Sequence, residues 1–409
     1  MQQRPPADAS RVLLGLGNTL DHELVWDGEV VTNLLREHRV GSVPTGPDVA
    51  VEDEEDLVRS LLAHLAAGTG GEHFVASSAS LLRFADRFEV RTTLGGTNLR
   101  AALAMRALGR ASTVHLVSTG EATYALLPAD QQVVSSARHD SFDPHVVVQF
   151  PAGAEVRVGD RTVVAPSANR VIYVNDRPNS ELVVAEEFGD AAARADVVLV
   201  SGFNSVADVE TLVGRLADVR RHLARRRPGA LAVYEHGAFH VPGFADLVRR
   251  DLGPYVDVWS CNEDELQEQL HREIDLLRPR EVLEAVRQMH AAVGARTLVV
   301  HTRFWALALG GDGAGRRAML LGGTALAGAR YRYGDAVTPA DLAEATCWPR
   351  QPAAVSFAAA LEDLAGGEVT CCAAYRLDPP EPTTIGLGDA FIGGLVAALA
   401  DRAEAVPGS

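Results

Sequence analysis

The second half of the chain alternates short apolar runs with longer stretches whose apolar residues recur at helical spacing. The runs expected to be strands are 196–201, 230–234, 256–260 and 297–301. The stretches expected to be helices are 209–226, 244–251 and 281–293. This alternation is typical of a parallel, doubly wound α/β sheet. Ligands in such sheets bind beyond the C-terminal ends of the strands, so candidate residues are sought there.

The middle of the chain has a different pattern of apolar and turn residues. From 131 to 187, short β-like runs are separated by turn residues, which predicts a mostly antiparallel sheet. A further helix is expected from 98 to 108, directly after Gly95-Gly96. The Gly-rich segment 310–313 lies between apolar runs at 307–309 and 318–321 and resembles a hairpin.

The composition excludes several kinds of phosphate chemistry. The chain has no lysine, so all 38 basic residues are arginine. A Walker A loop and the usual protein-kinase site both require lysine, and so does Schiff-base chemistry. Any phosphate must therefore be bound by backbone amides, arginine or a metal ion.

Net charge and cysteine content limit the kinds of partner and the cellular setting that we expect. A net charge of −16 argues against non-specific binding to nucleic acid or anionic membranes. The four cysteines form no Cys-x-x-Cys pair, so free thiols in a reducing, cytoplasmic setting are expected. No signal-peptide core and no long apolar run is present in the sequence.

The most informative motif is Gly386-Leu387-Gly388-Asp389, which precedes an apolar, Ala-rich helix. A glycine turn at a helix N-terminus offers backbone N–H groups to a phosphate, and the helix dipole favours anions there. Asp389 would lie beside that phosphate, where it can take a proton from an attacking hydroxyl. The alternative is an Asp that only caps the helix.

Other polar groups follow expected strands. Asn262 and Glu265 follow the strand at 256–260 and can orient a hydrated Mg²⁺, or they can form a helix N-cap. Asp21 follows the first strand and can bind sugar hydroxyls, or it can be a turn residue. Glu235 and His236 end another strand, where a metal site competes with a structural histidine.

Two arginines in the β-rich segment are candidates for phosphate contact. Arg170 and Arg177 can reach a transferring phosphate from a closing lid, or they can be an exposed pair. The turn at Gly95-Gly96 lets a polar ligand approach the backbone, or it is ordinary strand–helix punctuation.

With these motifs in this order, the chain resembles the ADP-dependent glucokinase/phosphofructokinase family of the ribokinase-like superfamily. The 386–389 turn matches the family's Gly-x-Gly-Asp motif, and Asn262 and Glu265 match its Asn-x-x-Glu motif. The further matches are Asp21 and Gly95-Gly96 in the sugar site, Asn169-Arg170-Val171-Ile172 in the lid, Ser201-Gly202-Phe203-Asn204, and His301-Thr302.

The resemblance implies a large doubly wound domain (1–20, 95–130 and 188–409) that binds the nucleotide, and a smaller β-rich lid (21–94 and 131–187). The implied reaction is Mg²⁺-dependent transfer of the β-phosphoryl group of ADP to a sugar hydroxymethyl, in carbohydrate metabolism such as glycolysis. We expect a monomer or small homo-oligomer.

The resemblance also assigns roles. Asp389 is the general base, and Gly386, Leu387 and Gly388 form the anion hole. The implied sugar ligands are Asp21, Gly95, Gly96 and Asn98. The implied nucleotide ligands are Asn262, His301, Thr302, Gly386 and Gly388. Glu265 orients metal-bound water. The family's His-x-Glu metal motif is replaced by Tyr234-Glu235-His236, so either Glu235 or His236 takes the place of its Glu.

Two alternatives remain. An ATP-dependent sugar or nucleoside kinase on the same scaffold is compatible with the altered metal motif. A non-catalytic sugar- or nucleotide-binding relative is the other, although Asp389 argues against it. The sugar acceptor, glucose or fructose 6-phosphate, is not specified by these motifs.

Overall fold

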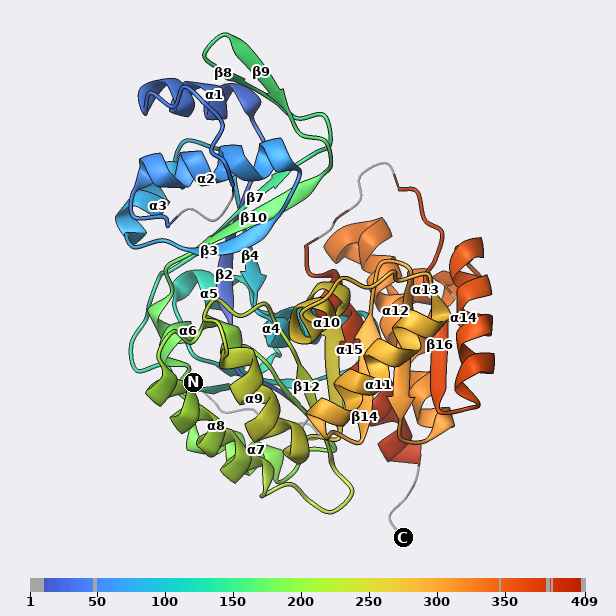
Figure 1. The fold of residues 1–409 in the computed structure, drawn as a ribbon. Helices are drawn as coiled ribbons and strands as arrows, with labels where there is room; N and C mark the ends of the chain where they lie inside the picture. Colours follow the sequence, from blue (N-terminus) through green and yellow to red (C-terminus); the bar gives the residue numbers. More distant parts are fainter. Residues whose placement is uncertain (1–10, 47–49, 346, 380–382, 384, 406–409) are drawn as a thin grey trace.

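Two sheets organise the chain, and each has its own hydrophobic core (Figure 1). The computed structural model describes residues 11–46, 50–345, 347–379, 383 and 385–405. The larger sheet forms the body of the molecule, and the smaller sheet forms a lid above it (Figure 1).

The body sheet has nine strands. In spatial order they are β16 (Val369–Ala373), β15 (Trp305–Gly310), β14 (Thr297–His301), β13 (Val258–Asn262), β12 (Leu231–Glu235), β11 (Val197–Val200), β1 (Val12–Leu14), β5 (Thr113–Leu116) and β6 (Gln132–Ser135). The strands from β14 to β6 are parallel, and β15 and β16 add an antiparallel edge. The predicted α/β class with a doubly wound sheet is confirmed.

Helices cover both faces of this sheet. One face carries α7 (Glu186–Ala192), α8 (Val209–Leu223), α9 (Phe244–Leu252), α11 (Pro279–Val293) and α14 (Pro352–Ala365). The other carries α4 (Thr97–Ala107), α12 (Gly313–Tyr333) and α15 (Leu387–Ala405). The short helices are α5 (Glu121–Leu126), α6 (Arg177–Glu181), α10 (Glu263–Leu270), α13 (Pro339–Ala345), and the 3₁₀ turns Phe203–Ser205, Gly253–Tyr255 and Gly334–Ala336.

The lid is a five-stranded sheet with helices on one face. Its strands, in spatial order, are β3 (Gly71–Phe74), β10 (Asn169–Val174), β7 (His145–Phe150), β2 (Thr19–Leu24) and β4 (Val90–Gly95). A hairpin of β8 (Glu155–Val158) and β9 (Arg161–Val164) and the helices α1 (Gly28–Glu37), α2 (Glu54–Ala67) and α3 (Ser78–Ala85) complete it. Side chains alternate along β10, so Val171 and Tyr173 enter the lid core and Arg170 points to the opposite face.

Three expectations need correction. The lid sheet is mixed and not mostly antiparallel, because β3 pairs in parallel with β10 and β2 pairs in parallel with β7. Strand β6 lies inside the segment 131–187 but pairs with β5 in the body sheet. The hairpin expected around 310–313 is wrong: the Asp312 side chain accepts a hydrogen bond from the Gly315 N–H (2.7 Å) and caps α12, so 318–321 is helical.

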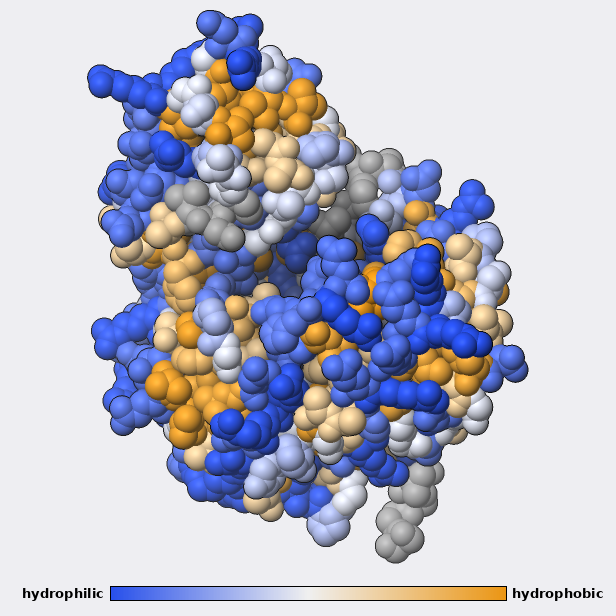
Figure 2. All heavy atoms as spheres, in the orientation of Figure 1, coloured by the Kyte–Doolittle hydropathy of each residue, from blue (hydrophilic) through white to orange (hydrophobic). Residues whose placement is uncertain are grey.

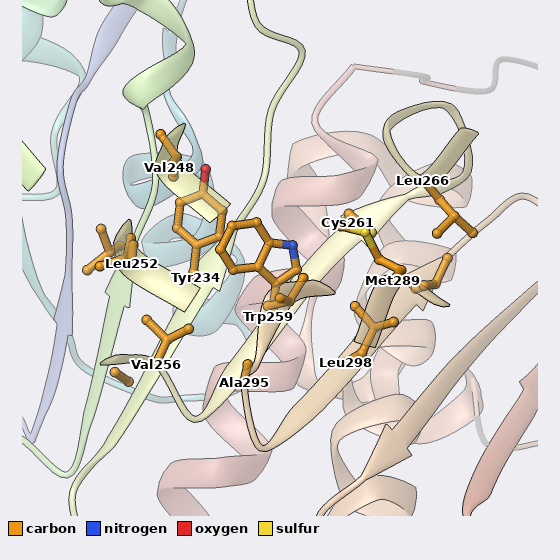
Figure 3. Packing of buried hydrophobic residues seen from close by; sticks show 14 of the residues in the cluster. Tyr234, Val248, Leu252, Val256, Trp259, Cys261, Leu266, Met289, Ala295 and Leu298 are labelled. Atoms are coloured by element: carbon orange, nitrogen blue, oxygen red, sulfur yellow. The ribbon is translucent and has the colours of Figure 1, made fainter. Parts of the chain in front are cut away.

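Large buried side chains support the strand ends that carry the site. The rings of Tyr234 and Trp259, on neighbouring strands β12 and β13, lie 4.2 Å apart between centroids. Figure 3 shows these rings packed beside Val248, Leu252 and Val256. Because these side chains are fully buried, the residues that directly follow on β12 and β13 are held in fixed positions.

Candidate active site

The predicted glycine turn lies at the start of α15 and faces a cavity of about 760 Å³. Gly386 has φ +68°, a left-handed conformation that favours glycine. The first intrahelical bond runs from the Ala390 N–H to the Gly386 carbonyl, so the N–H groups before Ala390 have no acceptor within the helix. Gly386, Leu387, Gly388 and Asp389 all line the cavity. The turn can therefore present N–H groups and a carboxylate to one ligand.

Asp21 lies on β2, close to the glycine turn of β4 and α4. Its Oδ1 accepts a hydrogen bond from the Thr19 hydroxyl (2.7 Å) and its Oδ2 accepts one from Arg100 (2.7 Å). The Asp21 carboxylate occupies the space where a side chain on Gly95 would lie. Gly96 has φ +87°, and a Cβ there would lie 2.7 Å from the Gly17 carbonyl oxygen. Gly95 is thus required for the close approach of β4 to the β2 side chains, and Gly96 for its close approach to the backbone of residues 17–18.

A carboxylate pair and a histidine lie at the ends of β12, β13 and β14. His301 Nε2 lies 3.0 Å from Glu235 Oε1, while Glu235 Oε2 is buried without a hydrogen-bond partner. Burial, reinforced by the Glu235 charge, raises the pKa of Glu265 to about 8. Burial alone would lower the pKa of His301, but Glu235 raises it above its ordinary value. Two buried carboxyl groups side by side, one with an unpartnered oxygen, are destabilised unless a cation or proton lies between them, so this is a place for a cation.

The structure places Glu235 and His236 of the altered Tyr234-Glu235-His236 motif in different surroundings. Glu235 faces Glu265 and His301, whereas the ring of His236 lies between those of Phe239 (5.2 Å) and Trp259 (5.7 Å). Burial lowers the pKa of His236 to about 3, so this ring is neutral at physiological pH. His236 lines the cavity, but Glu235 is the side chain that fits a cation.

The side chains of Asn262 and Thr302 form hydrogen bonds with backbone groups of their own turns. Asn262 Oδ1 accepts from the Asp264 and Glu265 N–H groups (2.9 Å each), and Glu265 Oε2 accepts from the Asn262 N–H (2.9 Å), which is a complete capping box. The cap interpretation of Asn262 therefore holds, and the same box orients Glu265. The Thr302 hydroxyl accepts from the Phe304 and Trp305 N–H groups (3.0 Å each) within its own turn.

The structure separates the two lid arginines. Arg170 lines the cavity, where burial lowers the pKa of its guanidinium and the Asp389 and Glu72 charges oppose that effect. Arg177 lies on α6 with an 85% exposed side chain and pairs with Glu181 (2.6 Å). Arg177 is not part of the cavity lining. Asn98 is fully buried and its amide donates to the His115 carbonyl (2.6 Å), so it also lies outside that lining.

Glu72 and Arg100 are site residues that the sequence motifs did not single out. Glu72 lies on β3 and accepts a hydrogen bond from His240 of the body (3.1 Å), so it joins lid and body across the cavity. Arg100 lies on α4 between Asp21 and Asp389. Its neighbours in sequence, which include Asn98 and Arg106 on the same helix, do not set it apart. Figure 2 shows hydrophilic residues gathered where the lid meets the body.

Magnesium fits the donors present. Among the described residues, no group of three or more His, Cys, Asp or Glu side chains is arranged to hold a metal ion directly. Mg²⁺ usually keeps several waters and binds through one or two carboxylates plus substrate phosphates. Glu235 and Glu265, with one buried carboxylate oxygen unpartnered, supply that kind of donor set.

An α/β body, a lid, and a glycine turn with a carboxylate between them define a phosphotransferase of the kinase type. Residues 10–308 match the family described as "ADP-specific Phosphofructokinase/Glucokinase conserved region". The chain belongs to this family, a family of ADP-dependent sugar kinases, as the sequence motifs predicted. The matched region ends before α15, so the 386–389 turn is placed by the structure and not by this match.

Solved structures share the fold. A phosphofructokinase from Pyrococcus horikoshii OT3 with AMP has a TM-score of 0.76 at 16% identity, covering 98% of this chain and 100% of that chain. An ADP-dependent kinase in complex with fructose 6-phosphate and ADPβS has a TM-score of 0.73 at 13% identity, covering 96% and 94%. The last common ancestor of ADP-dependent phosphofructokinases from Methanosarcinales has a TM-score of 0.69 at 14% identity, covering 96% and 94%. No curated protein sequence matches the chain.

Within the described part of the chain, no helix combines the length and apolar character that crossing a membrane requires.

Proposed function

We propose that the protein transfers the β-phosphoryl group of ADP to a hydroxymethyl group of a sugar or sugar phosphate, leaving AMP. The observation that carries the proposal is the 386–389 turn, whose N–H groups and Asp389 carboxylate line the cavity that Arg170 enters from the lid. Transfer of a phosphoryl group needs positioning and charge stabilisation more than covalent chemistry, and this geometry offers both.

Each residue has a part in the proposed reaction. Asp389 accepts the proton of the attacking hydroxyl as the oxygen–phosphorus bond forms. The backbone N–H groups at the start of α15 bind the oxygens of the transferring group, and Arg170 neutralises its charge from the lid. Asp21, on β2, would hold sugar hydroxyls; it does not line the cavity itself, but Arg100 contacts both Asp21 and Asp389.

Glu235 and Glu265 are the residues that would hold a hydrated Mg²⁺. When bound, Mg²⁺ neutralises phosphate charge and fixes the donor's orientation. The rest of the cavity suits a nucleoside, because Tyr331, Tyr375 and Leu377 line it beside the small residues Ala327 and Gly328. Structural neighbours of this chain hold AMP, or fructose 6-phosphate with ADPβS, which supports a diphosphate donor and a sugar-phosphate acceptor.

A coupled phosphotransfer assay tests the proposal. The assay would offer ADP or ATP with Mg²⁺ to the protein, with glucose, fructose 6-phosphate, ribose and nucleosides as acceptors. We expect AMP to form from ADP with glucose or fructose 6-phosphate. Turnover with ATP alone would support the ATP-dependent kinase instead. Nucleotide binding without turnover on any acceptor would support a non-catalytic relative.

A further inference from the structure

Arg100 is a buried arginine that belongs to none of the motifs in the sequence. Its side chain is 7% exposed. Its Nη2 donates to Asp21 Oδ2 (2.7 Å) and also lies 3.4 Å from both Glu23 Oε1 and Thr93 Oγ1. These acceptors lie on β2 and β4, so one body residue on α4 binds two neighbouring strands of the lid sheet.

The same guanidinium reaches the glycine turn of α15. Arg100 Nε lies 4.0 Å from Asp389 Oδ2. A Cβ on Gly386 would lie 3.0 Å from Arg100 Cδ and 3.2 Å from its Nη1, so the arginine packs directly against this turn. Arg100 therefore touches the proposed sugar-site carboxylate on one side and the proposed base on the other.

Charge explains why this position holds an arginine. Asp21, Glu23 and Asp389 would repel one another across a water-poor space, and that repulsion grows as the local dielectric falls. Arginine stays charged when buried and offers several N–H donors in a rigid planar fork. Burial alone would lower the pKa of Arg100, but Asp21 and Asp389 raise it above its ordinary value.

Other charges near the turn do not make this link. Arg330 also lies beside Gly386, but its Nε donates to the Ile385 carbonyl (2.9 Å) and its Nη1 pairs with Asp335. Arg170 faces Asp389 from β10 across the cavity. Arg100 is thus the guanidinium, among the described residues, that contacts both Asp21 and Asp389.

Building on the proposed function, we propose that Arg100 is a positioning residue that fixes Asp389 relative to Asp21. Through this link, a sugar bound at Asp21 has its hydroxyl held at the distance from Asp389 that proton removal requires. Small displacements of reacting groups are costly: a shift of about 1 Å can lower a rate by about 10²-fold. Arg100 acts through the two carboxylates and does not itself contact the phosphoryl group.

A double-mutant cycle tests the proposal, with kcat and KM measured for wild type, Arg100→Met, Asp389→Asn and the double variant. We expect Arg100→Met to lower kcat by about 10- to 100-fold and to raise the KM for sugar, with little change in the KM for ADP. In the Asp389→Asn background, the same change should alter kcat by less than about threefold, because Arg100 acts through Asp389. Losses that multiply, or an unchanged kcat in Arg100→Met, would overturn the proposal.

Two further variants separate positioning from folding. Arg100→Lys keeps the charge but loses the fork, so its kcat should lie between those of wild type and Arg100→Met. Arg316 is as buried as Arg100 but donates to Thr370 and backbone carbonyls at the opposite end of the sheet. Arg316→Met should lower stability without changing the KM for sugar. If the kcat of Arg100→Lys does not lie between those two values, the role of Arg100 is purely structural and the proposal is contradicted.

Hydrogen exchange distinguishes failure of this inference from failure of the proposed function. In Arg100→Met, amides of 19–24 and 385–391 should exchange faster than in wild type, whereas Arg316→Met should leave both segments unchanged. This readout needs no turnover. If wild type transfers no phosphoryl group, the proposed function fails while the link through Arg100 is still tested. Unchanged exchange in both segments would refute the link itself.

Discussion

Asp389 is the third residue of α15 and lines the cavity with a 23% exposed side chain, so it is accessible to a substrate hydroxyl. Because Asp389 is the proposed base, the Asp389→Asn variant should keep the fold and nucleotide binding but lower kcat by at least about 10²-fold. The measurement is steady-state turnover together with calorimetric ADP affinity. Asp312→Asn is the matched control, because Asp312 caps α12 outside this cavity. Turnover near the wild-type value in Asp389→Asn would remove the base assignment.

Arg170 and Arg177 allow a second comparison between single residues. The lid sequence predicts a phosphate contact for both, but only Arg170 lines the cavity. Arg170→Met should lower kcat by roughly 10²-fold or more, the usual loss when a donor to developing charge is removed. Arg177→Met should leave kcat unchanged, since that side chain is exposed and paired with Glu181. Equal losses in the two variants would contradict the placement of Arg170.

At the level of elements, α12 and α15 cross closely because glycines face each other. A Cβ on Gly394 would meet the carbonyl oxygen of Gly322, and backbone cannot move aside as a flexible side chain can. Gly394→Ala should therefore lower the free energy of unfolding by about 1–3 kcal/mol, measured by urea denaturation. Gly214→Ala on α8 is the control, because its Cβ meets nothing within 4 Å and should stabilise by up to about 1 kcal/mol. A stable Gly394→Ala would show that the helices can separate.

Local patterns predicted elements better than they predicted contacts. The alternation after residue 188 predicted β11 to β14 and their helices, because hydrophobic periodicity is a local property. The 310–313 hairpin failed because α12 is stabilised by packing of Gly322 and Gly323 on α15, which lies far along the chain. Arg100 was missed for the same reason: its partners come from β2, β4 and α15, and nothing in its neighbours in sequence points to them.

At the scale of the whole molecule, a buried polar network lies where the chain passes between lid and body. His145, at the start of β7, lies 3.1 Å from Asp176 Oδ2, and Asn179 donates to the same oxygen (2.7 Å). Asn179 also donates to the Asn18 carbonyl (2.8 Å), in the connection between β1 and β2. The network thus joins three of the segments that link the two sheets.

This network should make stability depend on pH in the alkaline range. Burial opposes the charge on His145, but Asp176, with Asp21 and Glu72 nearby, raises the pKa of His145 to about 9 from 6.5. Because the folded-state pKa is the higher one, the stabilisation is complete below about pH 6.5 and is lost as pH rises through about 9. Thermal unfolding from pH 6 to 10 should show the gap between wild type and Asp176→Asn narrowing toward pH 10. Asp208→Asn removes a similar helix cap without a histidine partner, so its gap should stay constant over this range. A constant gap for Asp176→Asn as well would mean that the His145 pair is not ionised in the folded protein.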